Sequence, residues 1–110
     1  MKYRKKPVVI EAYRLSLGIY QTLVEGENQA HKFFDDWGFP DWLKKAWDKG
    51  IVFIDNSVPN KALRLCIRTL EGDHYPRTDD WIVQGVMGEL YPVKNNIFEK
   101  TYEVLDETTD

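Results

Sequence analysis

Alternation of apolar and polar residues predicts a β-strand near the start of the chain. Residues 6–15 are rich in β-branched and aromatic side chains, and the face that carries Val8, Ile10 and Ala12 is the more apolar. We therefore expect that face to meet the core. Residues 16–26 mix β-branched side chains with two glycines, a pattern that leaves helix and strand both open.

Helical periodicity occurs twice in the middle of the chain. Between residues 27 and 37 the apolar residues recur every three or four positions, the spacing of one helix face, and Gly38 offers a stop. Pro40 can open a second helix, which Gly50 ends. The first apolar stripe is Ala30, Phe33, Phe34 and Trp37, and the second is Trp42, Leu43, Ala46 and Trp47.

Short strands and tight turns are predicted for the second half of the chain. Residues 51–55 form a short apolar run, and residues 62–70 alternate, with Leu65 and Ile67 on one face and Cys66 on the other. A tight turn at residues 71–73 then leads into a further extended segment.

A hairpin is predicted between residues 81 and 91. Its turn contains Met87 and Gly88, and a two-residue turn would force the long Met87 side chain into a left-handed conformation. A type I turn with Gly88 left-handed avoids that strain. After the hairpin, we expect one helical turn or a loop that places Ile97 and Phe98 under the sheet, followed by a last strand at residues 99–105.

Together these elements predict one small α+β domain that spans residues 1–110. We expect a largely antiparallel sheet of about five or six short strands with two helices packed on it. The length of 110 residues is usual for a single domain. Residues 106–110 are polar and acidic and are expected to fray.

Composition excludes several classes of protein. The net charge of −3 lacks the basic excess typical of DNA-binding domains. Cys66 is the only cysteine, which excludes a disulfide within the chain and a cysteine-rich zinc site. No apolar run could span a membrane or form a signal-peptide core, so we expect a cytoplasmic protein with no membrane partner.

Charge is unevenly distributed, with basic residues near the start and acidic residues near the end. One interpretation is a nucleic-acid-binding arm. The other is that the first and last strands lie side by side and their charges offset one another, which the negative net charge favours. The nucleic-acid alternative would use Arg4, Lys5, Lys6, Arg64 and Arg68.

Two residues are candidates for chemistry. Cys66 lies between Arg64 and Arg68, and neighbouring cations lower a thiol pKa. No base or oxyanion site accompanies it, so an unreactive thiol is the favoured interpretation. His74 lies near Asp73, Asp79 and Asp80, but aspartates are also common in turns. We therefore predict no catalytic residue, no metal and no cofactor, and keep an enzyme or small-ligand-binding protein as an alternative.

Three tryptophans are candidates for binding a partner protein. They are Trp37, Trp42 and Trp47. Trp is a preferred anchor at interfaces, although for any one of the three rings the core is the favoured interpretation. Trp42 and Trp47 are separated by about 140° around a helix axis, so one can face the core while the other faces a partner.

Three stretches of the sequence resemble a family of small phage and prophage proteins. They are KKPVVIEAYRL at residues 5–15, LRLCIRTLEG at 63–72 and DDWIVQGVMGELYPVKNNIFEKTYE at 79–103. The family has Pro-Gly where this chain has Thr78-Asp79, and cysteine where it has Val93. Aspartate tolerates the left-handed conformation better than most residues, so we expect Asp79 to keep this turn. The resemblance implies a small soluble protein of phage origin that acts inside an infected bacterium. It supplies no catalytic residues, and residues 16–61 do not take part in it.

The sequence therefore leads to ranked hypotheses of function. The first is a non-enzymatic accessory protein that binds a host or defence protein, such as a nuclease or a CRISPR effector, with residues 16–61 as the specific surface. The second is a nucleic-acid-binding protein that uses the basic residues named above.

Overall fold

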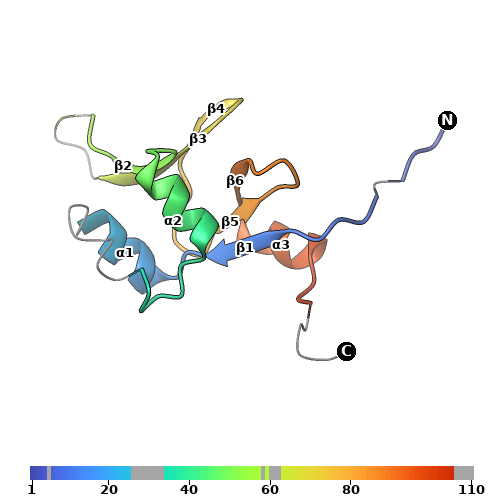
Figure 1. Ribbon diagram of the computed structural model, residues 1–110, viewed down its shortest axis with the longest axis horizontal. Helices are drawn as coiled ribbons and strands as arrows, with labels where there is room; N and C mark the ends of the chain where they lie inside the picture. Colours follow the sequence, from blue (N-terminus) through green and yellow to red (C-terminus); the bar gives the residue numbers. More distant parts are fainter. Residues whose placement is uncertain (5, 26–33, 58, 60–62, 106–110) are drawn as a thin grey trace.

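The protein has nine regular elements in the part of the chain that the computed structural model describes, which is residues 1–4, 6–25, 34–57, 59 and 63–105. The predicted α+β class is confirmed. In chain order (Figure 1), the elements are β1 (Glu11–Arg14), α1 (Leu17–Glu25), α2 (Asp41–Asp48), β2 (Val52–Asp55), β3 (Arg64–Thr69), β4 (Gly72–His74), β5 (Trp81–Gln84), β6 (Leu90–Val93) and α3 (Asn95–Thr101).

The six strands form two antiparallel sheets of three strands instead of the single sheet expected, and three helices accompany them in the described residues. One sheet has the order β1-β5-β6 and the other has the order β2-β3-β4. The chain leaves β4 through the buried Pro76 and reaches β5, which pairs with β1 from Glu11 opposite Gln84 to Arg14 opposite Trp81. This long-range pairing with β1 separates β5 and β6 from the second sheet.

The main core draws apolar side chains from both sheets and from α1 and α2. The contribution of β3 to this core follows from strand alternation, because Leu65 and Ile67 occupy one face of β3 as predicted. An aromatic group around Phe39 completes the core. The buried members are Leu15, Leu23, Phe34, Phe39, Leu43, Ala46, Val52, Leu65, Ile67, Ile82 and Leu90.

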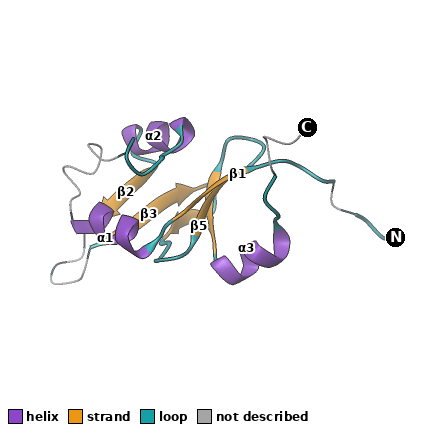
Figure 2. Ribbon diagram, turned by 90° about the horizontal axis from the view of Figure 1, so that it is seen from below, coloured by secondary structure: helices purple, strands orange, loops and turns teal. Residues whose placement is uncertain are grey.

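A second, smaller cluster lies on the other face of the β1-β5-β6 sheet, under α3. Figure 2 shows α2 and α3 on opposite sides of that sheet. Val83 and Tyr91 are directly opposite each other on the α3 side, and Val83 is fully buried. Trp81 stacks on Phe98 with ring centroids 4.0 Å apart, and Phe98 stacks on Tyr102 at 4.9 Å. These rings attach α3 to the sheet.

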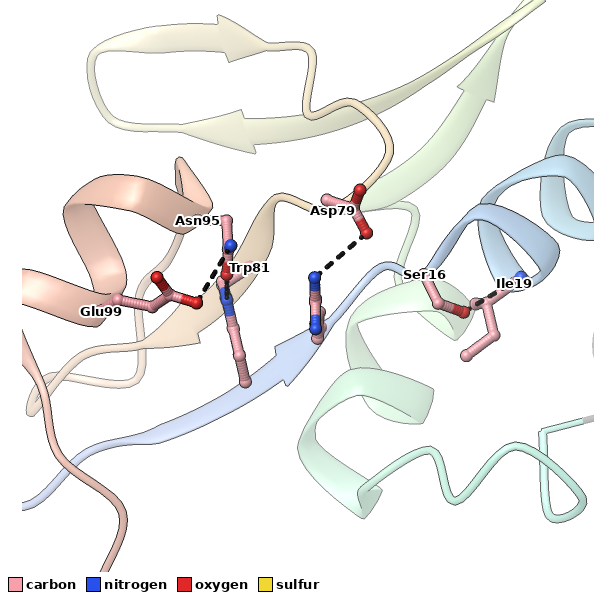
Figure 3. Close-up of polar contacts among 7 residues, drawn as sticks. Ser16, Ile19, Asp79, Trp81, Asn95 and Glu99 are labelled. Atoms are coloured by element: carbon pink, nitrogen blue, oxygen red, sulfur yellow. Dashed lines mark hydrogen bonds and ion pairs between the residues drawn. The ribbon is translucent and has the colours of Figure 1, made fainter.

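Asn95 links the start of α3 to this cluster (Figure 3). Its Oδ1 accepts a hydrogen bond of 2.9 Å from the indole Nε1 of Trp81, and its Nδ2 donates to Glu99 Oε1 at 3.2 Å. The Trp81 donor, which lies in a partly buried position, is thereby satisfied.

The prediction of a last strand at residues 99–105 is wrong. Residues 99–101 belong to α3, and residues 102–105 form neither helix nor strand. The apolar spacing of Phe98 and Tyr102 suits a helix, since residues four apart share a helix face, so Phe98 can stack on both Trp81 and Tyr102. The first and last strands that were expected to lie side by side are therefore not paired in the described residues. The predicted fraying of residues 106–110 lies outside the described residues.

The first predicted strand is shorter than expected, since β1 begins only at Glu11. The face prediction is wrong for Val8, which is exposed, while Ala12 lies opposite Val83 on the α3 side. Tyr13, from the other face, packs against the main core. Its hydroxyl donates to the backbone oxygen of Trp37 at 2.8 Å, and burial raises the Tyr13 pKa to about 12.

The middle of the chain is partly as predicted. The ambiguous segment forms α1, and α2 carries the expected stripe, with Leu43 and Ala46 buried. Of the predicted helix at residues 27–37, most lies outside the described residues, and residues 34–38 form turns. Gly38 has the left-handed conformation of a stop, with φ of 68°.

Both predicted left-handed turn positions are confirmed. Gly88 has φ of 83° in the β5–β6 hairpin, and its N–H donates to the Gly85 carbonyl at 3.0 Å. Asp79, at the place of a family glycine, has φ of 72°. Its backbone N–H donates to Leu15 O at 2.6 Å, and its carboxylate pairs with Arg14 at 3.3 Å. This turn brings β5 beside β1.

Replacing Asp79 by alanine is expected to lower the free energy of unfolding by about 1 kcal/mol more than replacing it by asparagine. Both changes remove the exposed Arg14 pair, but asparagine keeps a short polar side chain that tolerates the left-handed region. Urea unfolding of the two variants measures the difference. Equal stabilities would show that backbone conformation is not what selects the residue here.

Candidate functional site

A hollow lies between α2 and the β1-β5-β6 sheet. It is an open groove of about 420 Å³. Helix α2 begins after Pro40, whose extended conformation, with φ of −70° and ψ of 157°, starts the first turn. Leu43 and Ala46 are buried against the core. Ala46 and the residues beside this buried stripe on α2 border the groove. Its apolar lining is Trp42, Ala46, Ile51 and Leu90.

Charged side chains border the groove on both sides. Asp41 and Lys45 line it from α2, and Lys49 lines it from the position directly after the helix. Glu11 lines it from β1. The neighbouring Lys44 has carboxylate partners, at 2.6 Å from Asp35 and 4.0 Å from Asp41. Lys45 and Lys49 form no ion pair within the described part of the chain, so their charges are available to a partner.

Exposed apolar side chains continue the groove at the β5–β6 turn. Gly88 lines the groove, and the two residues before it, Val86 and Met87, are 66% and 87% exposed. Glu89 holds this turn, since its Oε2 accepts a hydrogen bond of 2.9 Å from the Met87 backbone. The groove thus adjoins apolar side chains that nothing in the described chain covers. Exposed apolar groups that adjoin a polar rim are typical of interaction surfaces.

The three predicted tryptophans occupy different places. All three are partly buried against the main core. Trp47 meets Phe34 edge-on at 5.5 Å and Trp37 lies 5.9 Å from Phe39, whereas Trp42 alone of the three lines the groove. The Trp42 indole N–H is buried and forms no hydrogen bond within the described residues. A buried donor without an acceptor costs about 1 to 3 kcal/mol.

The residues of the nucleic-acid alternative are not brought together. Arg64 and Arg68 lie on the outer face of the β2-β3-β4 sheet, whereas Arg4 and Lys6 lie in the segment that precedes β1 and projects from the body (Figure 1). Lys5 lies outside the described residues. On the sheet, Arg64 stacks on Tyr75 at 3.6 Å, and Arg68 lies 4.7 Å from the centre of the Phe53 ring.

Cys66 lies between these two arginines, as the alternation of β3 predicts, but its side chain is fully buried. Burial, followed by the charges of Asp73 and Asp55, raises the pKa of the thiol, and these effects outweigh the nearby Arg68. The structure therefore fits the unreactive thiol favoured above, because the thiolate is the reactive form.

Cys66 is expected to react with iodoacetamide at about pH 8 at least about tenfold more slowly in the folded protein than in urea. Mass spectrometry of samples quenched over time measures both rates. The raised pKa also means that the unfolded chain ionises first, so stability should fall as pH rises above the ordinary thiol pKa of about 8.5. Equal alkylation rates in the folded and unfolded chain would contradict the buried, protonated thiol.

His74 ends β4 opposite Ile67 and is partly buried. Asp79 and Asp80, its suggested partners, act in the turn before β5, where Asp80 Oδ2 accepts a hydrogen bond from the Arg77 backbone at 2.9 Å. Within the described residues no group of three or more His, Cys, Asp and Glu side chains could hold a metal ion. Neither His74 nor Cys66 lines the groove.

Several surface residues were missed by reasoning from the sequence. Val86 and Met87 read as strand and turn residues, and Phe53 and Tyr75 read as sheet residues. Strand register could have indicated Phe53, because it lies directly opposite Cys66 and so shares the face of Arg64 and Arg68.

Comparisons of the chain with protein-family models, with curated proteins and with solved structures found no match. Among the described residues, no helix combines the length and the apolar character needed to cross a bilayer. Proposals about function therefore depend on the surfaces described above.

Proposed function

We propose that this protein acts by binding another protein, not by catalysis, and that the groove beside α2 is its binding surface. The observation that carries this proposal is that the groove around Trp42 reaches Gly88, directly after the exposed Val86 and Met87. Tryptophan and methionine are enriched at protein interfaces, and an apolar centre with a charged rim is the usual interface pattern.

A protein partner fits this site better than a small ligand does. Small-molecule sites bury most of the ligand surface in a concave pocket. Here the groove is open, and next to it the β5–β6 turn leaves Met87 exposed outside the hollow. A surface of that shape can be covered by a second protein.

The partner surface should combine apolar side chains with carboxylates. The apolar groups would cover Trp42 and Met87, while carboxylates would meet the unpaired Lys45 and Lys49. Such charge pairs at the rim mainly steer association and select the partner.

The biological setting comes from the family resemblance. Three matched stretches suggest a phage or prophage protein, and α2 and its groove tryptophan lie in the part of the chain that the resemblance does not cover. The arrangement we infer is a groove whose α2 side is specific to the partner and whose sheet side, with Glu11, Gly88 and Leu90, belongs to the shared scaffold. The partner would be a host or defence protein of the infected bacterium, such as a nuclease or a CRISPR effector.

A photo-crosslinking amino acid at Met87 tests this proposal. In infected or lysogenic cells we expect Met87 adducts to one defined protein. The charge reversals Lys45→Glu and Lys49→Glu together should weaken binding of that purified protein by at least about tenfold. The matched control site is Leu70, which is equally apolar and fully exposed at the β3–β4 turn.

The controls separate specific binding from general stickiness. Lys94→Glu with Lys100→Glu alters the charge by the same amount near α3 and should leave the affinity within about twofold. Adducts that form equally at Met87 and Leu70, or no adduct at either site, would contradict the proposal. So would an affinity that the groove variant leaves unchanged.

Nucleic-acid binding is the second candidate, and the stacked pairs on the β2-β3-β4 sheet favour it. Arginine planes and aromatic rings on an open sheet face can stack on unpaired bases. Arg64 is already paired with Asp55 at 3.2 Å, which reduces the charge that remains for phosphates. Fluorescence anisotropy with single-stranded DNA and RNA at low salt tests this candidate, and binding should fall when Arg68 is replaced by glutamine. No binding by the wild-type protein would eliminate it.

A further inference from the structure

Two segments near the ends of the chain expose apolar side chains outside the folded body. The first is the arm, residues 1–10 without the undescribed Lys5, in which Val9 is 76% exposed. The second is the tail, residues 102–105, in which Val104 is 92% exposed and Leu105 is also exposed. Each segment carries apolar surface that a folded protein ordinarily covers.

The arm and the tail carry opposite charge. Lys2, Arg4 and Lys6 of the arm are exposed, as is Glu103 of the tail, and none of these four forms an ion pair among the described residues. The sequence adds one more basic residue to the arm region and three acidic residues after the tail, at 106, 107 and 110. The two segments are therefore complementary in charge as well as in apolar character.

Among the described residues of one molecule, no pairing between the arm and the tail is formed. Regular pairing of β1 with β5 starts only at Glu11, and α3 occupies the place of the predicted last strand. Strand β1 is also an edge of its sheet, with β5 as its sole neighbour in the described sheet. Edge strands that continue into an extended segment are common sites for pairing with another chain.

The arm and the tail both leave the folded body at its α3 end. Figures 1 and 2 show both segments at the end of the molecule where α3 lies, with the arm running away from the body. Tyr102, where the tail begins, has the extended backbone conformation of a strand, with φ of −122° and ψ of 153°. The tail thus begins in a conformation that suits backbone pairing.

We propose that two copies of this chain form a closed dimer in which the arm of each copy pairs with the tail of the other. Arm-to-arm pairing would bring Lys2, Arg4 and Lys6 against the same basic residues, which like-charge repulsion disfavours. Reciprocal arm-to-tail exchange pairs opposite charges twice and closes on itself by two-fold symmetry, so it does not grow into a filament. The groove residues take no part in it.

The oligomeric state of the full chain tests the exchange. Light scattering after size exclusion should give twice the monomer mass of 13.0 kDa for the wild-type protein at about 100 µM and low salt. Raising the salt to about 1 M should weaken dimerisation by at least about tenfold, because exposed charge pairs are screened.

Charge-swapped variants identify the segments that pair. Arm reversal, Arg4→Glu with Lys6→Glu, should weaken dimerisation by at least about tenfold, and so should tail reversal, Glu103→Lys with Asp106→Lys. The variant that carries all four changes should recover dimerisation to within about threefold of wild type. Leu70→Asp with Glu71→Lys, at the exposed β3–β4 turn, is the control and should dimerise normally.

Three results would overturn the proposal. One is a wild-type protein that stays monomeric at low salt, which is also the result expected if the arm and tail pair within one chain. Another is a dimer that neither reversal weakens. The third is a failure of the variant with all four changes to dimerise, although its circular dichroism spectrum matches that of wild type. None of these results bears on binding at the groove, which the Met87 crosslink reports separately.

Discussion

Replacing Phe39 by alanine is expected to lower the free energy of unfolding by about 3 to 5 kcal/mol. Phe39 is 6% exposed and lies at the centre of an aromatic group. Its ring is stacked on Phe34 with centroids 4.5 Å apart and meets Tyr13 edge-on at 4.8 Å. Its backbone N–H donates to the Phe34 carbonyl at 2.9 Å. Removing the ring therefore leaves a cavity where β1 meets the turn before α2.

Equilibrium unfolding in urea, followed by tryptophan fluorescence, measures this loss. Leu70→Ala is the control, because Leu70 is fully exposed and its truncation should change stability by no more than about 0.5 kcal/mol. Phe39→Leu, which fills part of the cavity, should lie between the two. A loss below about 1 kcal/mol for Phe39→Ala would show that the aromatic group does not hold the core together.

Replacing Phe98 by alanine is expected to lower the free energy of unfolding by about 2 to 4 kcal/mol and to release α3 from the sheet. Phe98 stacks between Trp81 and Tyr102. A helix of seven residues is too short to be stable in water, so α3 depends on that packing. The expected loss is smaller than for Phe39 because Phe98 is only partly buried.

Urea unfolding and amide hydrogen exchange measure the two consequences separately. In the Phe98→Ala variant, the amides of α3 should lose protection while those of β5 keep theirs. Ile97→Ala is the matched control, because Ile97 is the preceding residue of the same helix and is half exposed. Equal losses from Ile97→Ala and Phe98→Ala would contradict the packing of α3 described here, as would unchanged exchange in α3.

The candidate site could be predicted only in part from the sequence. Trp42 was among the predicted partner-binding residues, because a tryptophan beside a buried helix stripe is a frequent interface anchor. Lys45 and Lys49 could not be selected, since a lysine on a helix is ordinary until the neighbouring surface is known. The groove also needs Leu90 and Glu11, which are far from α2 in the sequence. Their proximity depends on how the sheet and the helix pack.

The sequence by itself determined the local features of this protein. The apolar stripe of α2, the alternation of β3 and the left-handed positions at Gly88 and Asp79 were all predictable. Each follows from the period of a helix or strand, or from the conformations that one residue type tolerates. Such constraints act between residues that are close in the chain, so a short window contains them.

Only the tertiary structure decided which strands pair and what residues 99–105 become. Apolar alternation is compatible with many strand partners, and the choice of β1 for β5 is made by burial of Tyr13, Ile82 and Val83 together. Likewise, residues 99–101 extend α3 because Phe98 can then stack on both Trp81 and Tyr102. Long-range burial outweighs local strand preference there, and it leaves the arm and the tail unpaired within one molecule.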